Sequence, residues 1–378
     1  MKKILIIDHW YKASGGANKS ALYAELSKFY ILEFVAINYP AYFKFLIYLK
    51  SFHPQISQWK NKKSYWDEVI QKYPSTFKLR TKLFNQATRG ISSYDAILQI
   101  GSLFGPVDNP KGVPYFSYHD STVRNPDQLW PLWMPKDFDQ YRDEWYALER
   151  DMFNQTTHIM TYSQWAKDTL VKDYGIDAQK ISVTGSSLKI TEDVSIDWNQ
   201  REQNVLFVST DFKRKGGYHL IEIFQTVVKE IPDATLTLVG SIPSDIQSIK
   251  KPWLNILGVL SKEDLLAVYR RASLLVHPAF YDPFPSVILE AANFEIPAVA
   301  SRVCGIPEMI REGQTGYVVD PKDTFVFSQR IILLLKDKAR LMALGKEAKS
   351  YVREKFHPKI VASRMKSVME PHMKGKSL

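Results

Sequence analysis

Short β-branched runs alternate with longer helical patterns along almost the whole chain, and this limits the possible folds more than any other feature. The alternation predicts βα units built around parallel sheets, which is an α/β fold class. In the first half the candidate strands are Ile4–Ile7, Leu32–Ile37, Ala96–Ile100, Tyr115–Tyr118, His158–Thr161 and Ile181–Val183. In the second half they are Val205–Val208, Thr235–Val239, Asn255–Leu257, Leu274–His277, Ala298–Ala300 and Tyr317–Val319.

The length of 378 residues predicts two domains, at about 100–200 residues per domain. The polar, aperiodic segment 190–204 is the candidate linker, so we expect one domain over 1–190 and another over 200–355. Ligands of open parallel sheets bind at the carboxyl ends of the strands. With two such sheets facing each other, the chemistry is expected in the cleft between them.

The single cysteine, Cys304, cannot form an internal disulfide, which favours a reducing compartment. The apolar run Ile4–Ile7 is too short for a signal peptide, and no stretch reaches the ~20 apolar residues of a membrane span. We therefore expect a cytoplasmic protein, either free or peripheral at the inner face of the membrane.

The net charge of +10 is concentrated at the start of the chain. Residues 1–90 hold 15 Lys and Arg against 5 Asp and Glu, whereas the remainder is balanced. This asymmetry indicates either a solvated basic face or an anionic partner such as a membrane surface or an anionic substrate. Nucleic acid is disfavoured, because the sequence has no zinc-ligand spacing, no basic helix and no RNP-like segment.

The most apolar part of this basic region lies within residues 41–63, where Tyr42–Phe52 is followed by Lys60, Lys62 and Lys63. Such a segment is typical of a helix on an anionic membrane surface, where a lipid-linked acceptor would be reached. At helical pitch Lys44 and Lys50 lie about 120° apart, so no clean polar face forms and a partly buried helix is the alternative.

Three segments carry candidate chemistry. Gly15 and Gly16 lie between a strand and a helix, where paired glycines allow close approach of an anion. Three cations and two glycines, Lys213-Arg214-Lys215-Gly216-Gly217, follow the first strand of the second half and suit a diphosphate. A plain or solvated turn is the alternative for both.

The third segment runs from His277 to Ala292 and is the densest. It carries Asp282 in a loop and Glu290 one turn inside a helix expected to start near Ser286, a good N-cap residue. Two carboxylates so placed can accept hydrogen bonds from sugar or ribose hydroxyls, while the helix N-terminus receives phosphate.

Taken together, Val205–Phe224 and His277–Asp320 resemble glycosyltransferase family 4, whose members have the GT-B fold of two Rossmann-like domains. The family motif Glu-x7-Glu, a Pro-Val-Val-Ala strand and a Gly-Gly-x-Pro-Glu loop correspond to Asp282-x7-Glu290, Pro297–Ala300 and Cys304–Glu308. Gly313, Gly316 and Asp320-Pro321 follow in the family order.

The resemblance implies a role for each matching residue. Glu290 corresponds to the Glu that holds the ribose, Asp282 to the acid that contacts the transferred sugar, and Lys215 to the Lys that neutralises the diphosphate. Gly16 is similar to the N-terminal glycine loop near the phosphates, and His119 to a histidine near the donor sugar. The expected catalytic residues are thus His119, Lys215 and Asp282; the expected donor-binding residues are Gly15, Gly16, Lys213, Arg214, Lys215, Pro283, Phe284, Pro285, Ser286, Val287 and Glu290.

The implied reaction is a retaining, metal-independent transfer of a sugar from a nucleotide diphosphate sugar, with no further cofactor. The acceptor would be a glycan, a lipid-linked saccharide or a small molecule, with cell-surface polysaccharide assembly preferred. The last helix, within 356–378, is expected to cross back to the first domain. Two alternative functions stay open: another GT-B enzyme such as a nucleotide-sugar epimerase, or a catalytically degenerate subunit that binds a nucleotide sugar or a membrane.

Four positions depart from the family pattern. Thr210 stands where the family has an arginine, so Arg214 or Lys213 would replace it, and Pro285, Glu295 and Cys304 stand where it has glycines. Asp137-Phe138-Asp139 has the form of a metal-binding Asp-x-Asp motif, but Gln140 three residues after Asp137 favours a helix cap.

Overall fold

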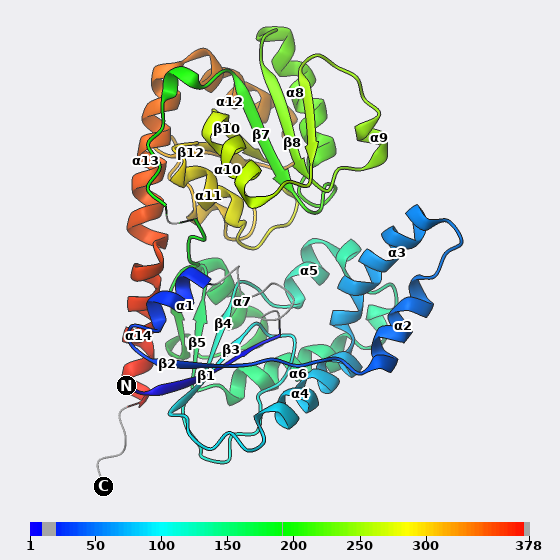
Figure 1. Ribbon diagram of the computed structural model, residues 1–378, viewed down its shortest axis with the longest axis vertical. Helices are drawn as coiled ribbons and strands as arrows, with labels where there is room; N and C mark the ends of the chain where they lie inside the picture. The colour runs from blue at the N-terminus through cyan, green and yellow to red at the C-terminus, as the bar shows by residue number, and fades with distance from the viewer. Residues whose placement is uncertain (10–19, 191, 374–378) are drawn as a thin grey trace. The chain divides into compact units, whose positions relative to one another are not determined.

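The computed structural model describes residues 1–9, 20–190 and 192–373. The chain divides into two compact units, Met1–Gly185 with Ala362–Leu378, and Ser186–Val361. Each unit contains a six-stranded sheet in which every neighbouring pair is parallel. The expected α/β architecture with two Rossmann-like sheets is therefore confirmed (Figure 1).

The sheet of the first unit has the strand order β2-β1-β3-β4-β5-β6. Its strands are β1 (Lys3–Asp8), β2 (Ile31–Val35), β3 (Ala96–Ile100), β4 (Tyr115–His119), β5 (His158–Thr161) and β6 (Ile181–Val183). Its α-helices are α1 (Ser20–Leu26), α2 (Ala41–Ser51), α3 (Ile56–Val69), α4 (Pro74–Thr88), α5 (Arg124–Leu129), α6 (Arg142–Gln155) and α7 (Gln164–Tyr174). The central strands β3 and β4 are buried along their full length and are mostly apolar, with Gln99 in β3 and Ser117 and His119 in β4 as the polar exceptions.

The sheet of the second unit has the strand order β12-β11-β10-β7-β8-β9. Its strands are β7 (Asn204–Ser209), β8 (Thr235–Gly240), β9 (Leu254–Gly258), β10 (Leu274–His277), β11 (Ala298–Ser301) and β12 (Gly316–Val319). Its α-helices are α8 (Gly217–Glu230), α9 (Ser244–Gln247), α10 (Lys262–Arg271), α11 (Ser286–Asn293), α12 (Thr324–Lys336) and α13 (Lys338–Phe356). The strands β7, β8 and β10 supply the centre of its core, against which α8 and α12 pack.

The last helix, α14 (Pro358–Met373), is separated from α13 by the single residue His357. From Ala362 onward it belongs to the first unit. There Lys2 donates to the carbonyl oxygen of Met373 at 2.8 Å, and the ring of His372 lies 5.3 Å from that of His158. Within the described residues, no helix is long and apolar enough to span a bilayer.

The first unit contains a buried carboxylate that the sequence does not reveal. Glu149 of α6 is fully buried and accepts hydrogen bonds from the Ser102 hydroxyl, the Val123 backbone N–H and the Tyr174 hydroxyl. Burial nevertheless outweighs these donors and raises the pKa of Glu149 from 4.5 to about 7. Glu149 thus links the segments after β3 and β4 to two helices.

We expect the free energy of unfolding to fall by about 3 kcal/mol between pH 4.5 and pH 7 because of Glu149. Its pKa is higher in the folded than in the unfolded chain, so its contribution is full below pH 4.5 and is lost as pH rises through about 7. Chemical unfolding across this range should show a smaller pH slope for Glu149→Gln. Glu144→Gln, an exposed change on the same helix, serves as control; equal slopes in both variants would contradict the assignment.

Candidate donor site

Three loops at the carboxyl ends of β7, β10 and β11 are tied together by hydrogen bonds. The backbone N–H of Phe280 donates to the carbonyl oxygen of Arg214 at 2.9 Å, and the Arg214 guanidinium donates to the carbonyl oxygen of Tyr281 at 2.8 Å. The backbone N–H of Gly305 donates to the carbonyl oxygen of Pro283 at 3.0 Å. This is the edge at which ligands of open parallel sheets bind.

Asp282 lies in the middle of these loops, 7 % exposed. Its Oδ2 is 3.3 Å from Nζ of Lys215 and 3.1 Å from Nε2 of His277. Burial alone would raise the pKa of Asp282, but Lys215, His277 and Arg214 outweigh it and hold the pKa below its usual range. Asp282 is therefore an anion, and its Oδ1 has no partner among the described residues.

His277 is fully buried and ends β10. Burial lowers its pKa, so the ring is neutral at pH 7. Because a carboxylate can only accept, Nε2 of His277 carries the proton that binds Asp282. The histidine therefore orients Oδ2 and leaves the ammonium of Lys215 as the nearest full positive charge.

Glu290 is held in a similar way on α11. It is 8 % exposed, and its Oε2 accepts a hydrogen bond of 3.0 Å from the hydroxyl of Tyr269, whose ring stacks on that of Phe294. Its Oε1 has a single charged neighbour among the described residues, Nζ of Lys189 at 4.0 Å. Each of the two acids thus has one oxygen fixed by the protein and one oxygen available to accept from a ligand hydroxyl.

Helix α11 begins at Ser286 as expected, but Ser286 is not its N-cap. The N-cap position is Pro285, which makes no side-chain cap bond, and the Ser286 hydroxyl instead accepts from Nζ of Lys189 at 3.0 Å. The first backbone N–H groups of α11 therefore lack a side-chain acceptor from the cap. Pro283, Phe284 and Val287 are buried around this turn.

The three cations of the segment Lys213–Lys215 have different surroundings. Lys213 is exposed. Arg214 is 8 % exposed and is bound to Asp211, with Nε 2.9 Å from the carboxylate, as well as to the carbonyl oxygen of Tyr281. Arg214 therefore joins two loops, and Lys215 is the cation that faces Asp282.

Gly216 sets how closely these loops approach. It caps α8 with a φ of +78°, and a Cβ at this position would lie 1.9 Å from the carbonyl oxygen of Pro278. Gly313 has a similar φ of +71° but open space around it.

We expect Gly216→Ala to lower the free energy of unfolding by about 2 kcal/mol, because backbone strain and overlap with Pro278 add together. Gly313→Ala carries only the backbone strain and should cost about 1 kcal/mol. Denaturant titration of both variants measures the difference; an equal loss would show that the close approach of the two loops contributes nothing.

The glycines missing from the family pattern are explained by backbone conformation. Glu295 and Cys304 are the non-glycine residues with positive φ in the described chain, at +55° and +51°. They therefore keep the left-handed conformation that glycine adopts readily. Pro285 has a φ of −68° and needs no such freedom.

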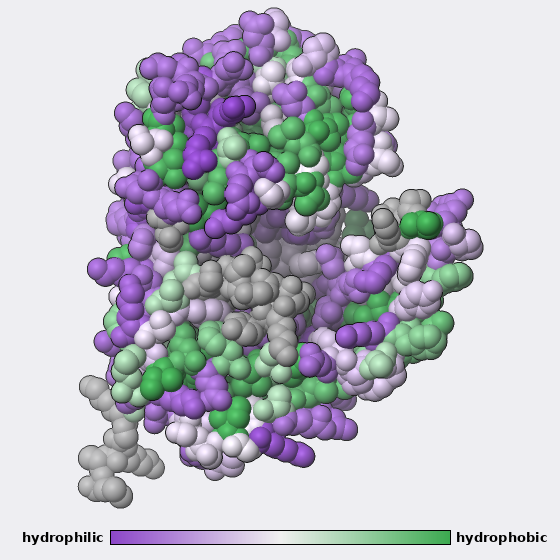
Figure 2. All heavy atoms as spheres, in the orientation of Figure 1, coloured by the Kyte–Doolittle hydropathy of each residue, from purple (hydrophilic) through white to green (hydrophobic). Residues whose placement is uncertain are grey.

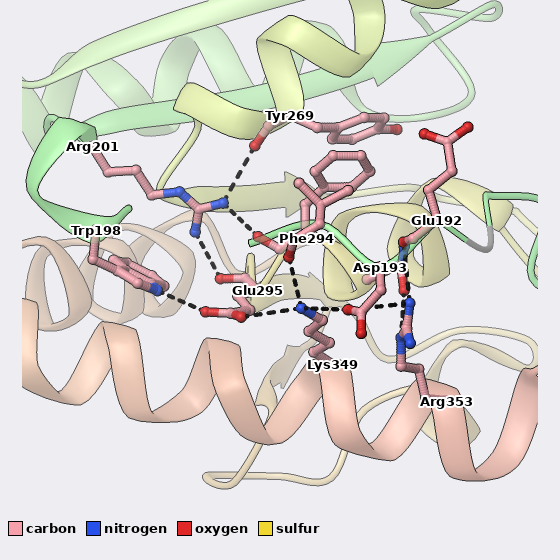
Figure 3. A network of polar contacts seen from close by, with 11 residues as sticks. Glu192, Asp193, Trp198, Arg201, Tyr269, Phe294, Glu295, Lys349 and Arg353 are labelled. Carbon is pink, nitrogen blue, oxygen red and sulfur yellow. Dashed lines mark hydrogen bonds and ion pairs between the residues drawn. The ribbon is translucent and has the colours of Figure 1, made fainter. Parts of the chain in front are cut away.

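The side chain of Glu295 is held in place by the network of polar contacts drawn in Figure 3. Its carboxylate accepts from Nε1 of Trp198 at 3.0 Å and lies 3.3 Å from Nζ of Lys349. Buried Arg201 donates to the carbonyl oxygens of Glu295, Phe294 and Tyr269. The segment expected as a linker is therefore bound to the second unit close to Tyr269, which holds Glu290.

The other residues expected from the sequence belong to the first unit or lie outside the described residues. His119 ends β4 in the first unit, where it is buried with its ring edge-on to Phe153 at 5.3 Å. Gly15 and Gly16 lie outside the described residues. Asp137 does precede a short helical turn, but its carboxylate makes no cap bond and instead accepts from the hydroxyls of Tyr73 and Tyr141, so the capping interpretation is wrong in detail. No group of metal ligands occurs among the described residues.

Three residues of the site were missed by sequence reasoning. His277 carried a signal, because it is a polar residue at the end of an apolar strand. Tyr269 and Lys189 carried none, since each reaches the site only through the packing of a distant segment.

Comparison with known proteins finds glycosyltransferases that are similar to this chain. Residues 189–351 match the family model described as glycosyl transferases group 1. The capsular polysaccharide biosynthesis glycosyltransferase CapM of Staphylococcus aureus is 23 % identical over 248 residues, which cover 61 % of this chain and 65 % of CapM. The D-inositol 3-phosphate glycosyltransferase of Corynebacterium efficiens is 28 % identical over 230 residues, 54 % of each chain. The chain thus spans about half to two thirds of these curated relatives.

Solved structures of similar fold cover the whole chain. Sucrose-phosphate synthase from Thermosynechococcus elongatus has a TM-score of 0.69 at 17 % identity, covering 98 % of this chain and 99 % of its own. Anabaena HepE in complex with UDP has a TM-score of 0.66 at 15 % identity, covering 98 % and 100 %. Residues 189–351 of this chain are thus similar to the group 1 glycosyltransferases, and its two sheets have the fold of these solved structures.

Proposed function

We propose that this protein transfers a sugar from a nucleoside diphosphate sugar to a hydroxyl group of an acceptor, with retention at the anomeric carbon and without a metal ion. The observation that carries the proposal is a pair of buried carboxylates, Asp282 and Glu290, each with one oxygen bound by the protein, together with the ammonium of Lys215 beside Asp282. Oδ1 of Asp282 would accept from a hydroxyl of the transferred sugar and Oε1 of Glu290 from the ribose.

Leaving-group stabilisation would come from the chain's own positive charge. In the proposed step the bond between the anomeric carbon and the phosphate oxygen breaks, and a bond to the acceptor oxygen forms on the same face of the sugar. The departing diphosphate takes the acceptor's proton, so no side chain need act as base. Lys215 and the N-terminus of α11 would bind the negative charge that develops on the diphosphate.

The relatives support a donor of this class and a role in glycan assembly. HepE has been solved with UDP and with UDP-glucose, and TarM of S. aureus with UDP. CapM is named for capsular polysaccharide biosynthesis, and an Escherichia coli relative is an O-antigen chain mannosyltransferase. We therefore propose a saccharide acceptor, free or lipid-linked. His119 enters the proposal through the family resemblance, as a residue near the donor sugar.

The test is turnover of a panel of UDP-, GDP-, ADP- and dTDP-sugars by the full chain, with a chelator present. Even without acceptor, slow release of one nucleoside diphosphate is expected, and proton NMR of a transferred product should show the anomeric configuration of the donor. Inversion, or activity that disappears with the chelator, would contradict the stereochemical or metal-free part of the proposal. A changed sugar on an intact nucleotide would indicate an epimerase.

A further inference from the structure

Helix α2 of the first unit carries its apolar residues on the side that faces solvent. Four large side chains follow one helical face at positions i, i+3, i+4 and i+7, and a fifth follows at the C-cap, where the backbone leaves the helix. Each is 45–58 % exposed: Tyr42, Phe45, Leu46, Leu49 and, at the C-cap, Phe52. We call these five residues the α2 stripe. Figure 2 shows hydrophobic side chains on the part of the surface where Figure 1 draws α2.

The opposite face of α2 is the one that packs on the protein. Phe43 is buried, with its ring stacked on that of Tyr39 at 4.7 Å, and Ser51 is buried and accepts from Nε1 of Trp59. The helix therefore has a packed face that fixes it to its own unit and a second apolar face that nothing in the described chain covers. Ile56, at the start of α3, adds another apolar side chain, 67 % exposed.

Basic residues predominate in the segment that carries the α2 stripe, although one of them, Lys63, is paired with Asp67 of α3 at 2.7 Å. No Asp or Glu occurs between Glu33 and Asp67, whereas Lys44, Lys50, Lys60, Lys62 and Lys63 all lie in this interval. On α2 itself Lys44 and Lys50 are both exposed and lie between the stripe and the packed face, one on each side of the helix, with Nζ of Lys50 4.5 Å from the centre of the Trp66 ring. An apolar face bordered only by cations matches a surface that offers hydrocarbon at depth and negative charge at its boundary.

We propose that the α2 stripe and its flanking lysines dock this protein on an anionic lipid bilayer. A second copy of the chain is a poorer partner for this face, because two such surfaces would bring Lys44 and Lys50 of both copies together. The apolar side chains would enter the boundary between headgroups and acyl chains while the lysines stay at the phosphate level. The proposal concerns a surface remote in sequence from the donor residues and does not depend on the transfer reaction.

Cosedimentation of the full chain with lipid vesicles, without any nucleotide, tests the proposal. We expect binding to phosphatidylcholine vesicles with about 30 % phosphatidylglycerol and much weaker binding to phosphatidylcholine alone. Raising the NaCl concentration from about 0.1 M to 0.5 M should weaken the binding, because it screens the lysines. Equal binding to both vesicle types, or binding to neither, would overturn the proposal.

The decisive variant replaces Phe45, Leu49 and Phe52 by serine together. We expect the vesicle partition coefficient to fall by about tenfold or more, with an unchanged melting temperature because all three side chains are exposed. Phe325→Ser removes an equally exposed ring from the second unit, where it is 69 % exposed, and should bind as the wild type does. Equal losses in both variants would overturn the assignment to α2.

Two further outcomes separate the alternatives. If light scattering shows a dimer that the triple serine variant loses, and vesicles do not bind, the stripe is an interface between copies and the proposal is wrong. Nucleotide binding by the same preparations is measured separately. A protein that binds vesicles but no nucleotide would contradict the proposed function alone, and the reverse would contradict only the lipid surface.

Discussion

Lys215→Met is expected to lower kcat about a thousandfold while changing the donor KM only a few-fold, because Lys215 is the cation placed to stabilise the departing diphosphate. In the resting protein its ammonium is balanced by Asp282 at 3.3 Å, so its full charge is used only as negative charge develops on the phosphate. Single-turnover kinetics with saturating donor measure this directly.

The matched control is Lys213→Met, two positions earlier in the same loop, where the side chain is exposed. We expect it to change kcat by less than about threefold, as removal of a screened surface charge does. If both variants lose the same activity, the net charge of the loop matters rather than the position of Lys215. If Lys215→Met raises KM and leaves kcat intact, Lys215 contributes ground-state binding only.

Removing Lys215 also changes the ionisation of its partner. Lys215 is the largest of the effects that lower the pKa of Asp282 against its burial, so the pKa of Asp282 should rise in Lys215→Met. A group with a depressed pKa stabilises the fold above its unfolded pKa and loses that contribution as pH falls. The variant should therefore show a smaller loss of stability on acidification than the wild type, which pH-dependent thermal melts can detect.

Glu290→Gln is expected to weaken nucleoside diphosphate binding about a hundredfold, because the NH2 of the amide cannot replace a buried charged oxygen as acceptor for the ribose hydroxyl. The change keeps the side-chain volume and leaves an oxygen for the hydroxyl of Tyr269. Calorimetry with the ribonucleotide and its 2′-deoxy analogue should show that the wild type discriminates between them and that the variant largely does not.

Two companion variants make this result interpretable. Glu222→Gln changes an exposed acid on α8 and should leave the affinity unchanged. Tyr269→Phe removes the hydroxyl that fixes Oε2 of Glu290, and it should reduce the discrimination between ribose and deoxyribose more than it reduces stability. Unchanged affinity in Glu290→Gln would remove Glu290 from the donor site.

The positions of the twelve strands in the described part of the chain could be predicted from the sequence, because strands of a parallel sheet are short and mostly apolar segments. The predicted ends of the strands differ from the observed ones by at most two residues. The sequence predicts a strand over Leu32–Ile37, for example, whereas β2 ends at Val35. The pairing of Asp282 with Lys215 could be expected because both residues follow strands whose carboxyl ends lie at one sheet edge.

Other features of the site could not be predicted, because they depend on side-chain packing between distant segments. The bond from Tyr269 to Glu290 and the contact of Lys189 with Ser286 leave no local pattern. Glu295 and Cys304 stand where the family pattern has glycines, yet both residues have the positive φ that glycine adopts readily. A motif comparison records residue types, whereas what the fold requires at these positions is a positive φ.

We infer that the second unit binds a nucleoside diphosphate through Asp282, Glu290 and Lys215. Isothermal titration of the full chain with UDP, GDP, ADP and dTDP, in a chelator-containing buffer, tests it most directly. We predict that one of these binds with a dissociation constant in the micromolar range, and that Glu290→Gln weakens the same titration. Absence of binding by all four to the folded protein would contradict the claim.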